Sequence, residues 1–298
     1  MTKTLIKAVF NILFLAILAI LLHRYASLEQ IQLTIKQIPP VSFAAGVSML
    51  VITYILRTHR FFQLLKGYPV SWSGILKVML RHNAINNLLP FRLGELSFPV
   101  LLKKQENIDF QTSLKVLLTA RLYDLLIMGG LAFILINFLL FRNNVAWLAL
   151  ELIIFILMVA LLAWLTYQQK IAFLQRFKLY FIYLQQNFRQ TSTTSLLIWA
   201  FKTTGQALLL APMLQTHWNY ALLAILIIEG TAILPVNGPL NFGSLEGATL
   251  AVLTPLGLQA KTVLAAILNL HLAIIMLAAL GYLLSLFIPS PRHKEVSS

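Results

Sequence analysis

The chain has 298 residues, of which 59% are hydrophobic and only 11% are charged, and its mean hydropathy is +0.83. This composition excludes an ordinary soluble domain and is typical of a polytopic helical membrane protein. The net charge of +14 does not indicate nucleic-acid binding, because the cationic residues cluster at the ends of apolar segments, where anionic lipid headgroups attract them. The absence of cysteine excludes disulfides and thiolate metal sites, and we expect no cofactor.

Several apolar segments are long enough to cross the hydrocarbon as helices. In chain order they are Leu5–Leu22, Pro40–Leu56, Leu114–Phe141, Val145–Tyr167, Leu196–Leu214, Tyr220–Leu234 and Thr262–Ile288. Lys3 and Lys7 precede the first segment as in a signal peptide, but no small-residue cleavage site follows it, so we expect a retained span. The fold class is therefore all-α, in a single membrane domain over residues 1–298.

Two further apolar intervals, Ile75–Leu102 and Pro235–Leu256, carry Pro, Gly, Asn and charge near their middle. Both contain Leu-Pro, then glycine, then glutamate, and we interpret both as re-entrant hairpins, with a kinked helix as the alternative for each. Interrupted apolar segments at corresponding places in two halves indicate a transport site. We expect six to eight crossings and repeat-like halves over residues 40–141 and 196–288. A span and a basic amphipathic surface helix at 171–189, alternatively a dimer contact, would join them.

Basic residues suggest the orientation. Those after the second span, the first hairpin and the fourth span are expected to be cytoplasmic by the positive-inside rule. We expect Arg57 and Arg60, which follow the predicted span Pro40–Leu56, to reach the interface by snorkelling. The basic tail at 292–294 also looks cytoplasmic, which a count of seven crossings from a cytoplasmic N-terminus does not allow. The side of the C-terminus therefore stays open.

Acidic residues are few, and four of the nine fall in or beside the two interrupted intervals. These four are Glu95, Asp124, Glu229 and Glu246. An ionisable group at membrane depth indicates a functional site by default. Of the others, we expect Glu29, Glu106, Asp109 and Glu295 in loops or tails and Glu151 near an interface.

In the first half, Arg92 lies between Pro90 and Gly94 at the tip of the predicted hairpin, and Asn87 lies just before it. A guanidinium offers a planar fork of donors that suits phosphate oxygens. Arg121 and Asp124 are three residues apart and share a helix face, so they can neutralise each other. That pair either fixes its helix to neighbouring helices or leaves Arg121 with donors for a phosphate.

In the second half, Asn237 and Asn241 flank Gly238-Pro239, and Glu246 follows Gly243-Ser244. Without an arginine at the tip, this half is chemically unlike the first. Asn269 and His271 occupy the last span, where a histidine is more often packed or hydrogen-bonded than a proton relay.

Three motifs together resemble the lysylphosphatidylglycerol synthase transmembrane region family. They are Asn-Asn-Leu-Leu-Pro-Phe-Arg-Leu-Gly-Glu-Leu at 86–96, Ala-Arg-Leu-Tyr-Asp at 120–124 and Gly-Ser-Leu-Glu at 243–246. The resemblance runs from about Arg57 to Gly281. This chain departs from the family in a reduced glycine-rich turn before Glu246 and in the lack of an arginine near Asn269 and His271.

The resemblance implies a flippase-like domain without the soluble aminoacyl transferase, and it does not fix the lipid. We expect a transporter that holds a phosphate-bearing headgroup, of the phospholipid or polyprenyl-phosphate type, between the two hairpins. No Walker motif is present, so we expect an ion gradient or passive equilibration rather than ATP. The residues expected to bind the headgroup are Asn87, Arg92, Glu95, Arg121, Asp124, Asn237, Asn241 and Glu246.

Two other function classes remain open at this point. One is a membrane partner of a lipid synthase or glycosyltransferase that transports nothing itself. The other is an intramembrane enzyme, although the chain has none of the familiar hydrolase or transferase motifs. We expect the bacterial inner membrane as location, membrane lipids as partners, and a homo-oligomer or synthase complex as possible assemblies.

Overall fold

The computed structural model describes residues 28–89, 93–140, 149, 153, 178–231 and 243–289. Every element in these ranges is a helix, as the sequence predicts. In chain order they are α2 (Leu28–Lys36), α3 (Pro40–Leu64), α4 (Trp72–Leu88), the 3-10 turn η1 (Leu93–Leu96), α5 (Ser97–Glu106), α6 (Phe110–Leu140), α9 (Lys178–Leu214), α10 (Trp218–Thr231), α11 (Ser244–Leu253) and α12 (Ala260–Phe287).

Four stretches of the described helices are long and apolar enough to cross a membrane. They are Pro40–Leu64, Phe110–Ile134, Gln186–Leu214 and Ala260–Phe287, and each contains or overlaps a span predicted from the sequence. Helices α10 and α11 are apolar but shorter. The predicted span Leu5–Leu22 lies outside the described residues, as does nearly all of Val145–Tyr167.

Helix α3 is longer than the predicted span. It continues through Leu64, so Arg57 and Arg60 belong to the helix and do not follow it. The snorkelling prediction for Arg60 is wrong, because its residue is only 2% exposed and its guanidinium contacts a carboxylate on another helix. The ion pair explains why Arg60 is buried among helices, where the sequence alone suggests the membrane interface.

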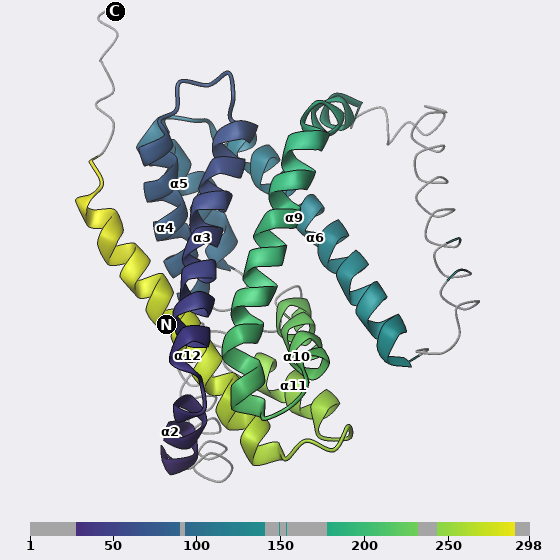
Figure 1. The fold of residues 1–298 in the computed structure, drawn as a ribbon. Helices are drawn as coiled ribbons and strands as arrows, with labels where there is room; N and C mark the ends of the chain where they lie inside the picture. Colours follow the sequence, from purple (N-terminus) through teal and green to yellow (C-terminus); the bar gives the residue numbers. More distant parts are fainter. Residues whose placement is uncertain are drawn as a thin grey trace, which may run out of the picture.

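Helices α3 and α9 run side by side and pack extensively against each other (Figure 1). Gly46 and Gly205 make this close approach possible. A Cβ atom on either glycine would lie 2.9 Å from the other's backbone oxygen. Small residues at a helix crossing bring the backbones together, which is how apolar helices associate closely in lipid.

Helices α4 and α5 pack together, and Glu106 at the end of α5 contacts the start of α4. The Glu106 carboxylate accepts hydrogen bonds from the backbone N–H of Ser71 (2.9 Å) and from its hydroxyl (3.0 Å), which completes the cap of α4. Glu106 is thus 2% exposed at the end of α5, and its predicted place in a loop is wrong. A carboxylate that serves a helix cap from a distant element cannot be distinguished in sequence from a loop residue.

The turn η1 lies against the side of α4. A Cβ on Gly94 would come within 2.3 Å of the Asn86 Cα, so a glycine is required at this position. This contact holds the backbone of Glu95 close to α4.

In the second half of the chain, residues 178–189 form the first part of α9 and are continuous with the span that follows. The described part of the predicted surface helix therefore belongs to a longer helix. Helices α10 and α11 pack against each other, α10 also contacts α9, and α11 contacts α12 (Figure 1). Helix α12 in turn contacts α2, α4 and α9, so it packs against helices from both halves of the chain.

Candidate functional site

A partly open cavity of about 190 Å³ lies where α3, α4, η1, α6, α9, α10, α11 and α12 converge. Its lining contains more charge than is usual for the interior of a membrane protein. The lining residues with an acidic, basic or imidazole side chain are Arg57, Arg60, His82, Glu95, Arg121, Lys202, Glu229 and His271. Since these come from elements far apart in sequence, the cavity is a product of the tertiary fold.

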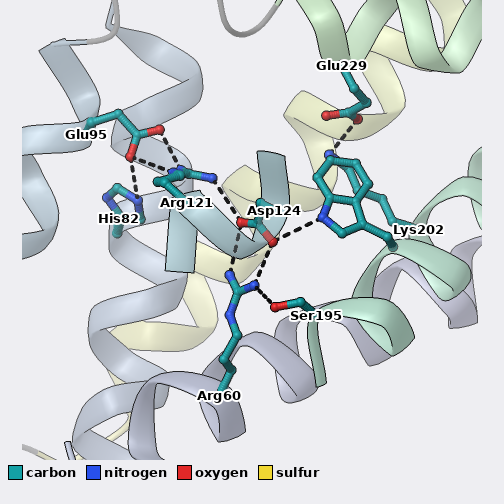
Figure 2. Close-up of polar contacts among 9 residues, drawn as sticks. Arg60, His82, Glu95, Arg121, Asp124, Ser195, Lys202 and Glu229 are labelled. Carbon is teal, nitrogen blue, oxygen red and sulfur yellow. Dashed lines mark hydrogen bonds and ion pairs between the residues drawn. The ribbon is translucent and has the colours of Figure 1, made fainter. Parts of the chain in front are cut away.

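A buried ion pair between Arg60 of α3 and Asp124 of α6 supports one wall of the cavity. Arg60 donates to both carboxylate oxygens of Asp124, at 2.6 and 3.1 Å, in a bidentate arrangement (Figure 2). Ser195 of α9 accepts a further hydrogen bond from Arg60 at 2.7 Å, and the Trp199 indole donates to Asp124 at 3.0 Å. The pair therefore fixes three helices to one another.

Arg121 connects this pair to Glu95. It lies 3.6 Å from Asp124 on the same helix face, which confirms the predicted contact, and it donates two hydrogen bonds to Glu95, one of them at 3.2 Å from Nε (Figure 2). His82 lies 4.0 Å from the same Glu95 carboxylate. With a side chain that is 42% exposed, Arg121 is the most accessible member of this chain of charges.

A further ion pair in the cavity lining joins Lys202 of α9 to Glu229 of α10 at 2.5 Å. Gln206, one turn further along α9, donates to the same Glu229 oxygen at 3.2 Å. The Lys202 ammonium also lies 4.9 Å from the centre of the Trp199 ring. Glu229, singled out in the sequence, thus has its charge balanced by a lysine that the sequence analysis overlooked.

Glu246 lies beside the cavity. Its carboxylate accepts from the backbone N–H of Gly243 at 2.7 Å, at the start of α11, and is 2.9 Å from Nδ1 of His271. His271 lines the cavity, whereas Glu246 is buried behind it.

The structure brings four of the predicted headgroup-binding residues to one place. Glu95, Arg121 and Asn87 line the cavity, and Asp124 lies directly behind the lining. Arg92, Asn237 and Asn241 lie outside the described residues, so their predicted roles are unchanged as predictions.

Sequence reasoning missed three cavity cations, Arg57, Arg60 and Lys202. Lys202 could have been found by its position, because it is an isolated cation inside the predicted span Leu196–Leu214. The two arginines carried no such signal, since they stand at the end of an apolar run.

Fold and site together define a helical integral membrane protein with a charged cavity between its helices. Comparison with known families makes the assignment more specific: residues 8–281 match the family described as lysylphosphatidylglycerol synthase TM region, and the chain belongs to that family. Comparisons with curated proteins and with solved structures give no match.

Proposed function

We propose that this protein is a lipid translocase, which moves a phosphate-bearing lipid of the phospholipid or polyprenyl-phosphate type across the membrane. The observation that carries the proposal is the charged cavity enclosed by helices that include all four candidate spans. Charged side chains inside a membrane-spanning bundle are costly, and they usually mark the path of a polar substrate or ion. Membership of the family supports the same conclusion.

In this proposal the headgroup occupies the cavity while the lipid tails stay in the bilayer. The outer surface of α12 suits such tails, because it exposes a row of large apolar side chains: Leu280, Leu283, Leu284, Leu286 and Phe287. We further propose that α4, η1 and α5 form a re-entrant hairpin, and that a second hairpin includes α11. Entry of a headgroup would begin at Arg121 and Glu95, the most accessible ion pair.

The proposal assigns no chemical change to the lipid. Glu95, Asp124 and Glu229 each contact a cationic side chain, an arrangement that suits charge balance better than general acid–base catalysis. Movement would depend on an ion gradient or on passive equilibration. We place the protein in the bacterial cytoplasmic membrane with membrane lipids as its partners, alone or as a homo-oligomer.

A membrane partner of a lipid synthase is the second candidate function. The bidentate Arg60–Asp124 pair favours it, because that pair is deeply buried and its contacts join helices α3, α6 and α9. In this alternative the charges are architectural, and substitutions in the cavity change stability only.

Lipid movement in proteoliposomes decides between the two. Purified protein is reconstituted with fluorescent anionic, zwitterionic and polyprenyl-phosphate lipids, and accessibility of the label to an external quencher is followed with and without a proton gradient. We expect one lipid class to move, and Glu95→Gln to slow that movement at least about tenfold, the change expected when a charge-assisted contact is lost.

Lys66→Gln is a surface control, because Lys66 is exposed just beyond α3 and is not one of the lining residues. It should leave lipid movement unchanged. Absence of movement for every lipid class, under either condition, would reject the transporter and favour the partner protein.

A further inference from the structure

Glu246 and His271 form a buried contact that the proposed function does not use. Their side chains are 5% and 3% exposed, and Oε1 of Glu246 lies 2.9 Å from Nδ1 of His271. His271 lines the cavity from α12, and Glu246 lies behind it in the first turn of α11. Carboxylates and histidines in contact at membrane depth are typical of proton relays in pumps and transporters.

This pair differs from the other ion pairs of the site in its basic member. Three carboxylates contact an arginine or a lysine, whose ordinary titration lies well above neutral pH: Asp124 with Arg60, Glu95 with Arg121, and Glu229 with Lys202. Glu246 contacts a histidine, the side chain type that ordinarily gains or loses its charge between pH 5 and 8. With a neutral His271 the pair carries one negative charge, and with a protonated His271 it carries none. Binding of a proton therefore changes the net charge at this wall of the cavity.

His82, the other histidine of the lining, has different contacts. Its Nδ1 is 2.8 Å from the hydroxyl of Ser97, and its Nε2 is 4.0 Å from Glu95, beyond hydrogen-bond distance. Glu95 already accepts two hydrogen bonds from Arg121. A proton on His82 would thus add positive charge next to a balanced carboxylate. A proton on His271 neutralises a carboxylate that has no other ion pair among the described residues.

The helices that pack against α11 and α12 determine which other charges face the pair. These helices are α2, α4, α9 and α10. Three of their side chains share the cavity lining with His271, namely His82 of α4, Lys202 of α9 and Glu229 of α10, and the last two balance each other. The other charged lining residues belong to α3, α6 and η1. The rest lie away from the pair: Glu29 and Lys36 of α2 and Lys261 of α12 are exposed, and Lys77 and Arg81 of α4 contact Ile288 and Ser285.

We propose that Glu246 and His271 form a proton-binding site, and that one proton bound and released there accompanies each lipid that moves. An ionised carboxylate can only accept, so Nδ1 carries the hydrogen of this contact, and Nε2 is the nitrogen that exchanges the proton with water. The second oxygen of Glu246 accepts from the N–H of Gly243 at 2.7 Å, so a change of charge at His271 reaches the start of α11. This inference rests on the proposed function and specifies its energy source.

The steady-state distribution of labelled lipid between the two leaflets tests the coupling. The three fluorescent lipids named above are reconstituted with the protein, a gradient of one pH unit is imposed, and valinomycin with equal potassium holds the membrane potential at zero. One proton per lipid should shift the distribution of the transported lipid about tenfold, since one pH unit is equivalent to about 1.4 kcal/mol per proton. His271→Gln keeps a donor for Glu246 but binds no proton, so the gradient should not shift the distribution in this variant.

Two other histidine variants are the matched controls. His82→Gln removes the second histidine of the lining, and His59→Gln removes an exposed histidine of α3. Both should keep the tenfold shift, whatever their rates of lipid movement. All variants are compared as single species in size-exclusion chromatography, so that misfolded protein is not counted. A shift of equal size in the parent protein and in His271→Gln, or transport in the parent without any shift, would overturn the inference.

Nitrogen NMR of protein labelled at its six histidines tests proton binding without transport. The signal of His271 is identified as the one that His271→Gln lacks. It should change with pH near neutrality, and Glu246→Gln should displace that change by about one pH unit or more, because the adjacent carboxylate favours the protonated imidazole. A His271 signal that is constant with pH, or that responds identically in Glu246→Gln, would reject the proton-binding site.

Failure of the translocase has a different signature from failure of this inference. A His271 signal that responds to pH through Glu246, in a protein that moves none of the three lipids, supports the proton-binding site and rejects translocation. A lipid that moves to the same distribution with and without the gradient supports the translocase and rejects its coupling to protons.

Discussion

The two glutamates of the similar Gly-Glu motifs have different surroundings. Glu95 lies in a 3-10 turn and reaches across to Arg121 on α6, within a chain of charges that continues through Asp124 to Arg60 on α3. Glu246 lies in the first turn of its own helix, binds the N–H of Gly243 there and has one further partner, His271. The first carboxylate joins distant elements, whereas the second stabilises mainly the start of α11.

This difference shows that a repeated sequence pattern does not imply repeated chemistry. A network that spans several helices depends on all of its charges, because a lost partner leaves another charge buried alone. A helix-start carboxylate mainly supports local backbone groups, and its loss affects fewer residues. Substitutions in the two regions should therefore have unequal consequences.

Asp124→Asn should have the largest effect. It leaves Arg60 buried without a counter-charge, and we expect a loss of about 3 kcal/mol or more in the free energy of unfolding. Thermal unfolding in detergent, followed by tryptophan fluorescence, measures this loss. The double variant Arg60→Met with Asp124→Leu removes both charges and should recover much of the stability. A single variant that melts like the parent protein would contradict the importance of the network.

Gly205→Ala should have the next largest effect, because it acts on the helix that carries Ser195, Trp199 and Lys202. The added Cβ would lie 2.9 Å from the Gly46 oxygen and would push α9 away from α3, at a cost of about 1–3 kcal/mol. Gly129→Ala on α6 is the matched control, since its Cβ would meet no other atom within 4 Å. Equal melting temperatures for the two variants would show that the crossing tolerates separation.

Glu246→Gln should cost less, about 1 kcal/mol, because the amide oxygen can still accept from Gly243 and only the contact with His271 is weakened. Glu246→Ala removes both contacts and should cost more. Comparing the melting temperatures of these two variants measures how local the role of Glu246 is. A loss for Glu246→Gln as large as that for Asp124→Asn would remove the distinction between the two regions.

Asp109 provides a baseline outside both regions and should give the smallest effect. Hydrogen bonds from the backbone and side chain of Thr112 lower the pKa of this exposed carboxyl below its ordinary 3.8, at the start of α6. A lowered pKa means that the stabilisation is present above the ordinary value and disappears as pH falls through the folded-state value. Asp109→Ala should therefore melt slightly earlier at neutral pH and like the parent at strongly acid pH. Asp109→Asn, which keeps the cap, should lie between them.

The long apolar helices could be predicted from the sequence because length and composition alone decide them. The contact between Arg121 and Asp124 was also predictable, since residues three apart on a helix are neighbours. The closer partner of Asp124, however, is Arg60, which stands 64 residues away on another helix. No local rule specifies such a partner, because it depends on how the helices pack.

The errors at Arg60 and Glu106 share one cause. Both residues stand at the edge of an apolar segment, where sequence reasoning assigns charge to water or to the interface. Each is buried because a specific partner, Asp124 for Arg60 and Ser71 for Glu106, lies on another element. Charge at a segment boundary is thus ambiguous until its partner is known.

The contact between Glu106 and the start of α4 has a consequence for how this family varies. A Cβ on Gly74 would lie only 1.4 Å from the Glu106 carboxylate, so the glycine and the glutamate occupy a shared space. The two positions should accordingly change together across related sequences. A homologue with a larger residue at position 74 should carry a short or neutral residue at position 106, and it must supply another acceptor for the first amide groups of that helix.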